Sequence, residues 1–163
     1  MALSKNQKKE VLEKVAGVAD TAKSVVFVNF HGLTVANSTE LRRQLRSSGV
    51  QYTVAKKTLT KKAFSEKGFE GTMPELLGEL AIASSEDLIA PAREVRNFEK
   101  KFEGKLSILG GVFDGKFMSK AEMTEIAMIP SEHTLRGMFV NLINSPIQRF
   151  VIALDQISKT KNS

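Results

Sequence analysis

The stretch VVFVNF, from Val25 to Phe30, constrains the fold of this chain more than any other feature of its sequence. It is an apolar run of strand length that lacks the alternation of polar and apolar residues seen in half-buried strands. Such a run is typical of a central β-strand that is covered on both faces. The fold must therefore supply neighbouring strands for this segment and helices to cover it.

Helices and strands alternate over the remainder of the first 130 residues. Apolar periodicity and capping residues predict helices from Ser4 (in a capping box with Gln7) to about Asp20, and over 34–49, 56–68, 87–102 and 119–129. Further strands are expected at 50–54, at 80–83 and in a hairpin over 106–118 that turns at Asp114-Gly115. A short turn of helix is expected after Pro74. The fold class is thus α/β (α+β), with a mixed sheet of about four to five strands flanked by helices.

The pattern changes after Pro130, where one long helix is expected. Ser131 can cap this helix, and Ser145-Pro146 is expected to restart or kink it. Its apolar residues recur at helical spacing up to Ile157, and no later element follows that could cover them. Two interpretations stay open: the helix folds back on the domain, or its uncovered face binds a partner helix. We therefore expect a globular domain over 1–130 and an extended helical segment over 131–163.

The charge of the chain is distributed unevenly. The net charge is +6, and residues 1–64 hold twelve Lys and Arg against four Asp and Glu. Such a distribution creates an oriented field that can steer a polyanion onto one side of the protein. A membrane surface is a weaker candidate, because the basic helices lack aromatic-rich apolar faces. No signal peptide or membrane-spanning run is visible, and the absence of cysteine fits a cytoplasmic protein.

The positive charge of the first 64 residues is expected on helix faces. In the third expected helix, Leu59, Ala63 and Phe64 fall on one side and the lysines on the other. In the second, Leu41 and Leu45 point to the core while three arginines form an outer stripe. One such face would be most simply a solvated surface, but three in succession favour contact with phosphate. With one Tyr and no Trp, binding of single strands by stacking is not expected.

The sequence carries no constellation that predicts catalysis. The only histidines, His31 and His133, have no spacing typical of paired metal ligands, and no nucleotide-binding or nucleophile motif is present. The glycine-rich GGVFDG is better explained by a hairpin than by a phosphate cradle. We therefore expect no catalytic residues, no metal site and no cofactor.

Several segments resemble a known family. HGLTVANSTELRRQLRSSGVQYTVAKKTLTKKAF is similar to the N-terminal signature of bacterial large-subunit ribosomal protein ten, the stalk-base protein of the ribosome. ELAIASSEDLIAPAREVRNFEKKF, GGVFDGK, IPSEHTL and SPIQRFVIALDQI resemble its later landmarks, in the same order. Two residues depart from the family pattern: His31 stands where Arg is usual, and Lys57 where Asn is usual.

The resemblance implies a structural protein of the large ribosomal subunit. The N-terminal domain would bind 23S rRNA at the GTPase-associated region, beside ribosomal protein eleven. The C-terminal helix would carry dimers of the acidic stalk protein (seven/twelve), which help to recruit translational GTPases. Members of the family can also repress their own messenger RNA. The alternative is a free-standing RNA-binding regulator or a ribosome-assembly paralogue with the same fold.

The resemblance and the charge pattern together select two sets of residues. The residues expected to bind RNA are Lys5, Lys8, Lys9, His31, Gly32, Arg42, Arg43, Arg46, Lys56, Lys57, Thr58, Lys61 and Lys62. The residues expected to bind the stalk dimers are Ile143, Ile147, Phe150, Val151, Leu154 and Ile157.

Overall fold

The structure, a computed structural model, describes residues 5–102 and 104–161, with the backbone alone for residues 5–8. The chain divides into two compact units, Met1–Ile129 and Pro130–Ser163. The elements of the first unit are α1 (Lys5–Thr21), β1 (Ser24–Phe30), α2 (Val35–Ser47), β2 (Gln51–Val54), α3 (Lys57–Glu66), β3 (Leu80–Ser85), α4 (Ala90–Lys101), β4 (Leu106–Phe113), β5 (Lys116–Met118) and α5 (Lys120–Ala127).

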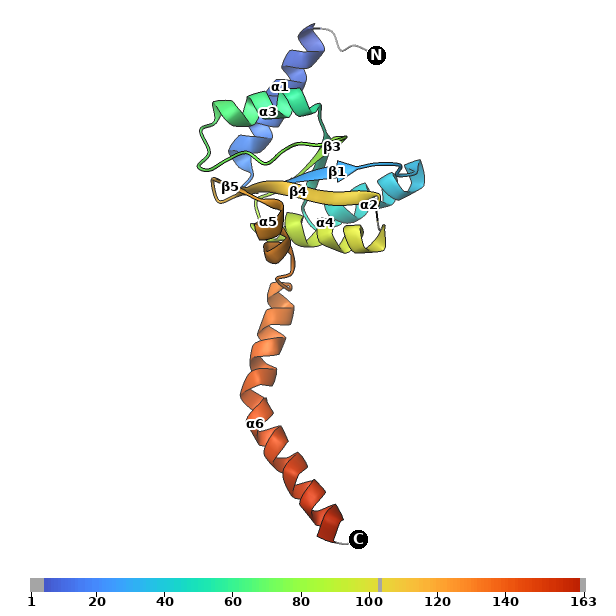
Figure 1. Cartoon of the computed structure of the whole chain (residues 1–163), viewed down its shortest axis with the longest axis vertical. Helices are drawn as coiled ribbons and strands as arrows, with labels where there is room; N and C mark the ends of the chain where they lie inside the picture. The colour runs from blue at the N-terminus through green and yellow to red at the C-terminus, as the bar shows by residue number, and fades with distance from the viewer. Residues whose placement is uncertain (1–4, 103, 162–163) are drawn as a thin grey trace. The chain divides into compact units, whose positions relative to one another are not determined.

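The strands form one sheet in the order β2-β3-β1-β4-β5 (Figure 1). β1 lies at its centre, where Val26 is opposite Ala83 of β3 and Gly111 of β4. The predicted α/β (α+β) class and the central strand are confirmed, but the sheet is antiparallel where a mixed sheet was expected. All pairs of named strands are antiparallel, and the parallel element found in the described residues is an isolated bridge between Glu70 and Lys116.

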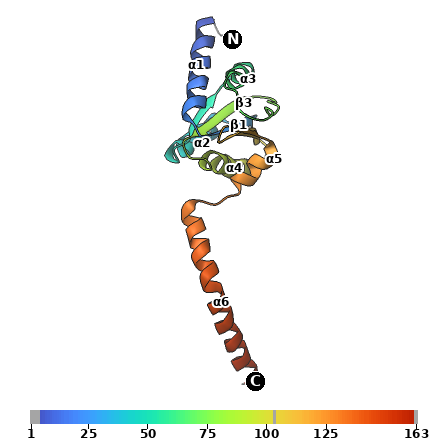
Figure 2. The ribbon, with the colours of Figure 1, turned by 90° about the vertical axis from the view of Figure 1, so that its left-hand side faces the viewer.

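Helices cover both faces of the sheet, as the apolar run in β1 requires. Val26 and Val28 belong to a core cluster with side chains of α2, α4 and α5, whereas Val25 and Phe27 belong to a second cluster with side chains of α1 and α3. Figure 2 shows these two helical layers on opposite sides of the strands. All four side chains are 1% exposed or less, so alternate residues of one strand are buried in two separate cores.

Several helix caps and the hairpin turn form at the residues that the sequence predicts. The N–H of Asn37 donates to Oγ1 of Thr34, which caps α2. Ser119 and Glu122 form a reciprocal capping box at the start of α5. Asp114 and Gly115 have positive φ angles of 48° and 80° in the turn between β4 and β5. The cap predicted at Ser4 lies outside the described residues.

Two predictions about local structure are wrong. Residues 72–77, where a turn of helix was expected after Pro74, contain no helix. Met73 and Leu76 instead pack against the cluster below α1 and α3, so tertiary contacts hold this segment irregular. Helix α4 begins at Ala90 rather than directly after Asp87, although Oδ1 of Asp87 does accept the N–H groups of Ile89 and Ala90.

The second unit is a single helix, α6 (Glu132–Lys161). The N–H of Thr134 donates to Oγ of Ser131, as expected for a cap. The helix is continuous through Pro146, so of the two outcomes expected there, a restart or a kink, the restart is wrong. Pro146 has no N–H to donate, and Figure 1 shows the helix axis curving along its length.

Candidate nucleic-acid interface

Part of the predicted RNA-binding set lies along the edge of the sheet formed by β2. This strand pairs with β3 alone among the described strands, so one side of it is open. Two groups of basic side chains flank it, one from α2 and one from the start of α3. We call these residues together the basic edge: Arg42, Arg46, Lys56, Lys57 and Lys61.

The arginine part of the basic edge is held in place by the core. Leu41 and Leu45 are buried, which turns Arg42 and Arg46 outward, one helical turn apart. Both arginines line a hollow whose other wall is Gly49 to Thr53. The Arg42 guanidinium lies 6.0 Å from the centre of the Tyr52 ring, within range of a cation–π contact.

Tyr52 is a member of this hollow that the sequence analysis missed. Burial raises the pKa of its phenol to about 12, although the nearby charge of Arg42 acts in the opposite direction. The phenol is therefore neutral near pH 7 and can donate a hydrogen bond. Its place on a predicted strand gave no sign that the strand would lie at the sheet edge.

The lysine part of the basic edge is fixed by the buried side of α3. Thr60, Ala63 and Phe64 are buried, and the Phe64 ring packs edge-on against Phe27 with 5.2 Å between ring centroids. The helix therefore presents its lysines to solvent. Lys57 and Lys61 line a hollow with the irregular segment from Met73 to Leu77.

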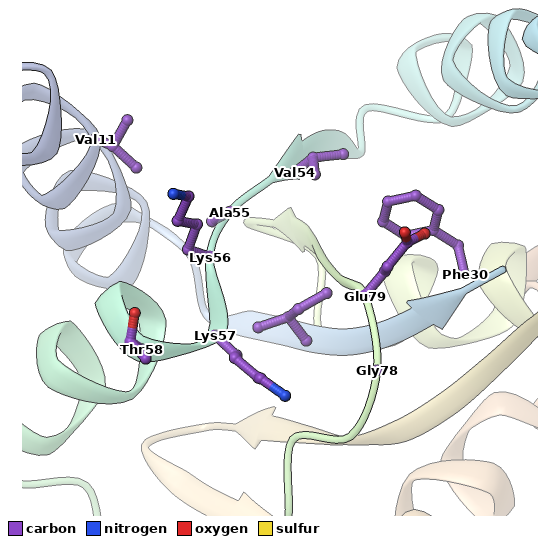
Figure 3. A pocket seen from close by; sticks show the side chains of 10 residues that line it. Val11, Phe30, Val54, Ala55, Lys56, Lys57, Thr58, Gly78 and Glu79 are labelled. Carbon is purple, nitrogen blue, oxygen red and sulfur yellow. The ribbon is translucent and has the colours of Figure 1, made fainter. Parts of the chain in front are cut away.

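A groove of about 690 Å³ lies beside the end of β2 (Figure 3). We call it the β2–α1 groove. Its lining residues are Val11, Phe30, Val54, Ala55, Lys56, Lys57, Thr58, Gly78, Glu79 and Leu80. Figure 3 shows Lys56 extending toward Val11, whereas the Glu79 carboxylate lies beside the Phe30 ring. The groove therefore has apolar walls with cations at one part and a carboxylate at another.

Those remaining predicted residues whose side chains the structure describes are exposed and line none of these hollows. His31 and Gly32 form the turn directly after Phe30, where the His31 N–H donates to the Lys105 carbonyl at 2.8 Å. Gly32 has a φ of 62°, which favours glycine at this position. Lys9 and Arg43 are exposed on α1 and α2, and the side chains of Lys5 and Lys8 lie outside the described residues. Lys62 is exposed and lies 3.9 Å from Glu66.

The basic edge differs from most basic residues of α4 and β5 in its charge partners, although other exposed lysines, such as Lys23, Lys100 and Lys120, also have no carboxylate within 4.0 Å among the described residues. Carboxylates pair with Lys67, Arg93, Arg96, Lys101 and Lys116. Lys101, for example, donates to Glu40 at 2.6 Å and lowers the pKa of that carboxyl. Within the part of the chain that the structure describes, no residue of the basic edge has a carboxylate within 4.0 Å. Their positive charge is therefore available to an external anion.

The predicted docking residues do not form one flat surface. α2 packs on one face of the sheet and α3 on the other, so the arginines and lysines lie on opposite faces. β2 connects them, and a polyanion that contacts both groups must follow this edge. Such contacts suit phosphates, which position a nucleic acid without reading its sequence.

α6 carries the second predicted site as an exposed apolar stripe. The six predicted residues are each more than half exposed, from Leu154 at 51% to Phe150 at 66%. Val140 and Ile152 are similarly exposed and were not predicted. No described residue of α6 is buried. None of the helices in the described part of the chain has the length and apolarity needed to cross a membrane.

Comparison with known proteins gives consistent results over nearly the whole chain. The sequence model of the family "Ribosomal protein L10" matches residues 3–100. The chain is 38% identical to the large ribosomal subunit protein uL10 of Staphylococcus carnosus (strain TM300) over 155 residues, which cover 94% of this chain and 93% of that protein. It is also 38% identical to uL10 of Shouchella clausii (strain KSM-K16), over 95% and 93% of the two chains, and 37% identical to uL10 of Staphylococcus aureus (strain JH9), over 94% and 93%. The chain therefore belongs to the ribosomal protein L10 (uL10) family, and it is a structural ribosomal protein of the large subunit that takes part in translation.

Proposed function

We propose that this ribosomal protein anchors the stalk of the large subunit. In this proposal the first unit binds 23S rRNA at the GTPase-associated region, beside ribosomal protein eleven. α6 carries dimers of the acidic stalk protein (seven/twelve), which support the recruitment of translational GTPases. The protein itself performs no catalysis, needs no cofactor, and acts on the ribosome in the cytoplasm.

The basic edge is the observation that carries the rRNA part of the proposal. Its five cations lack carboxylate partners within the described residues, whereas most basic residues of α4 and β5 have them. Arginine offers a fork of donors to phosphate, and lysine offers a compact charge. Each phosphate that they neutralise releases counterions, which supplies affinity that depends on salt.

The exposed stripe of α6 supports the stalk part of the proposal. Burying one large apolar side chain contributes roughly 1.5–3 kcal/mol before the costs of ordering. A helix that exposes a row of such side chains matches helix-in-groove recognition, in which residues at helical spacing act as anchors. Because the uL10 relatives align over about 94% of this chain, the similarity includes most of α6. This favours the stalk role over a free-standing regulator or an assembly paralogue, neither of which needs such a helix.

A salt titration tests the rRNA part directly. Changing Lys56, Lys57 and Lys61 together to Ala removes three phosphate contacts in the proposal. We expect the slope of log affinity against log salt, measured on a fragment of the GTPase-associated region, to flatten by about two to three units.

The matched control removes the same charge elsewhere on the first unit. Lys23, Lys100 and Lys120 are exposed and lie outside the basic edge. Their joint change to Ala should alter the slope by less than about one unit. Equal slopes for both triple variants, with both folded, would mean that only net charge matters and that the basic edge is not the docking surface.

A further inference from the structure

We propose that the β2–α1 groove holds one unstacked nucleotide of the bound RNA, with its base against the apolar walls and its phosphate at Lys56 and Lys57. This inference rests on the proposed rRNA binding and adds a base-binding site to a surface otherwise suited to phosphates. The groove would then contribute to the choice of RNA, which the basic edge alone does not provide.

The walls of the groove suit the face of a base. Val11 of α1, Val54 of β2 and Phe30 at the end of β1 line one hollow from three separate elements. Figure 3 shows Val11 at the Lys56 end and the Phe30 ring at the Glu79 end, with Val54 between them. Val54 is the last residue of β2 and is 47% exposed, so much of its apolar surface has no cover within the described residues. The volume of about 690 Å³ lies within the range of roughly 300–1,000 Å³ that is usual for small-ligand sites. Bases stack on aromatic and apolar side chains in this way in many RNA-binding proteins.

The charges of the groove orient the nucleotide. Lys56 and Lys57 extend in different directions in Figure 3, so they offer positive charge at two places along the groove. Within the described residues neither has a carboxylate within 4.0 Å. The Glu79 carboxylate lies at the Phe30 part of the groove, where it repels phosphate and can accept a hydrogen bond from a base amino group. Glu79 is held there by the backbone, because its carbonyl accepts the N–H of Phe30 at 3.3 Å. The base therefore lies at the Phe30 part and the phosphate at the lysine part.

The test fills the groove without changing any charge. Val54→Trp places a large ring in the groove, and Val11→Trp does so from the opposite wall. Val35→Trp is the matched control, because Val35 is 84% exposed on α2 and does not line the groove. Circular dichroism and thermal unfolding of the full chain identify any variant that fails to fold, and the second groove variant replaces it.

The affinity for the rRNA fragment is then measured at several salt concentrations. We expect each groove variant to lose about five- to tenfold in affinity with an unchanged salt slope, because a stacking contact is lost while the phosphate contacts remain. Val35→Trp should bind like the wild-type chain. If the groove variants also bind like the wild-type chain, the groove holds no nucleotide and the proposal is overturned.

Fragments with one base removed identify the nucleotide. We expect removal at one unpaired position to weaken binding of the wild-type chain by about five- to tenfold and to have no further effect on Val54→Trp. If the loss of affinity on removing a base adds to the loss caused by Val54→Trp at every position, the proposal is overturned, while rRNA binding itself stands. If the wild-type chain does not bind the unmodified fragment at all, the proposed function fails first, and this result is distinct from the other two.

Discussion

Large apolar side chains are buried in the first unit of this chain and exposed in the second. Phe27 of β1 is fully buried, in edge-on contact with Phe64, whereas Phe150 of α6 is 66% exposed. The sheet can bury apolar residues on both faces because helices from the same unit cover it. A single helix has no second layer, so its stripe can be buried only by something other than the helix itself. Apolar side chains thus stabilise the fold in the first unit and are available for recognition in the second.

Loss of part of α6 is the largest change that this comparison predicts. Truncation after Ser145 removes five of the six predicted stalk-binding residues and leaves the first unit intact. We expect it to abolish co-elution with purified acidic stalk-protein dimers in size-exclusion chromatography, with rRNA affinity unchanged. The double variant Phe150→Asp, Leu154→Asp should have the same effect, since burying an unpaired charge is unfavourable. Co-elution of the truncated chain would show that α6 is not the stalk-binding element.

The second prediction compares one substitution in the two units. Phe27→Ala should lower the free energy of unfolding of the first unit by about 3–5 kcal/mol, because it leaves a cavity beside Phe64. Phe150→Ala should change it by less than about 0.5 kcal/mol, because this side chain packs against no core. Denaturant titration of both full-length variants measures the difference. A large destabilisation by Phe150→Ala would mean that the stripe of α6 is ordinary core.

The third prediction compares two arginine pairs within the first unit. Arg42 and Arg46 have no carboxylate partners among the described residues, whereas Arg93 and Arg96 pair with Glu94 and Glu99. Changing Arg42 and Arg46 to Gln should flatten the salt slope of rRNA binding by about 1.5 units. The same change at the α4 pair removes equal charge and should leave the slope nearly unaltered. An equal change in the salt slope for both pairs would show that a carboxylate partner does not determine whether an arginine contacts RNA.

The smallest effect is expected at the helix caps. Ser119→Ala should lower the free energy of unfolding of the first unit by about 1 kcal/mol, whereas Ser131→Ala, at the start of α6, should leave it unchanged and reduce only helicity. Hydrogen bonds from Ser119, the backbone N–H first, lower the pKa of Glu122 below its usual 4.5. The stabilisation by Glu122 is therefore present above that value and is lost as the pH falls through the lower, folded pKa. Thermal unfolding of the wild type and of Ser119→Ala between about pH 6 and pH 3 would measure the effect of the cap and its dependence on pH. A difference in stability between the two proteins that grows as the pH falls would contradict this assignment.

Local signals in the sequence were sufficient for most of the fold. The central strand, the cap at Thr34 and the turn at Asp114-Gly115 each depend on a few neighbouring residues, so they could be predicted without the fold. The continuity of α6 through Pro146 could not be predicted, because a proline weakens a helix and the sequence does not show whether the neighbouring residues compensate. Residues 72–77 were missed for a related reason: their conformation depends on contacts with distant elements.

The candidate site shows the same limit. The exposure of the lysines of α3 and the arginines of α2 follows from helical periodicity. The position of the lysines relative to the arginines does not follow from it, because no local pattern indicates that β2 is an edge strand or that the two helices lie on opposite faces. Tyr52, Phe30 and Glu79 were missed as site residues for this reason. Tyr52 reaches the arginine hollow, and Phe30 and Glu79 reach the β2–α1 groove, through the pairing of β2 and β1 with β3.

The strand order also determines when this surface can exist during synthesis. β1 pairs with β3 and β4, which begin at Leu80 and Leu106, so its partners are made long after it. Such distant pairings make folding slow relative to helical proteins, and an unpaired apolar strand is prone to aggregation until its partners arrive. The basic residues of α2 and α3 are therefore translated early but acquire their arrangement only after β4 has left the ribosome that makes it. A nascent chain that ends before β4 should consequently be unable to dock on RNA, which ties docking to nearly complete copies of the first unit.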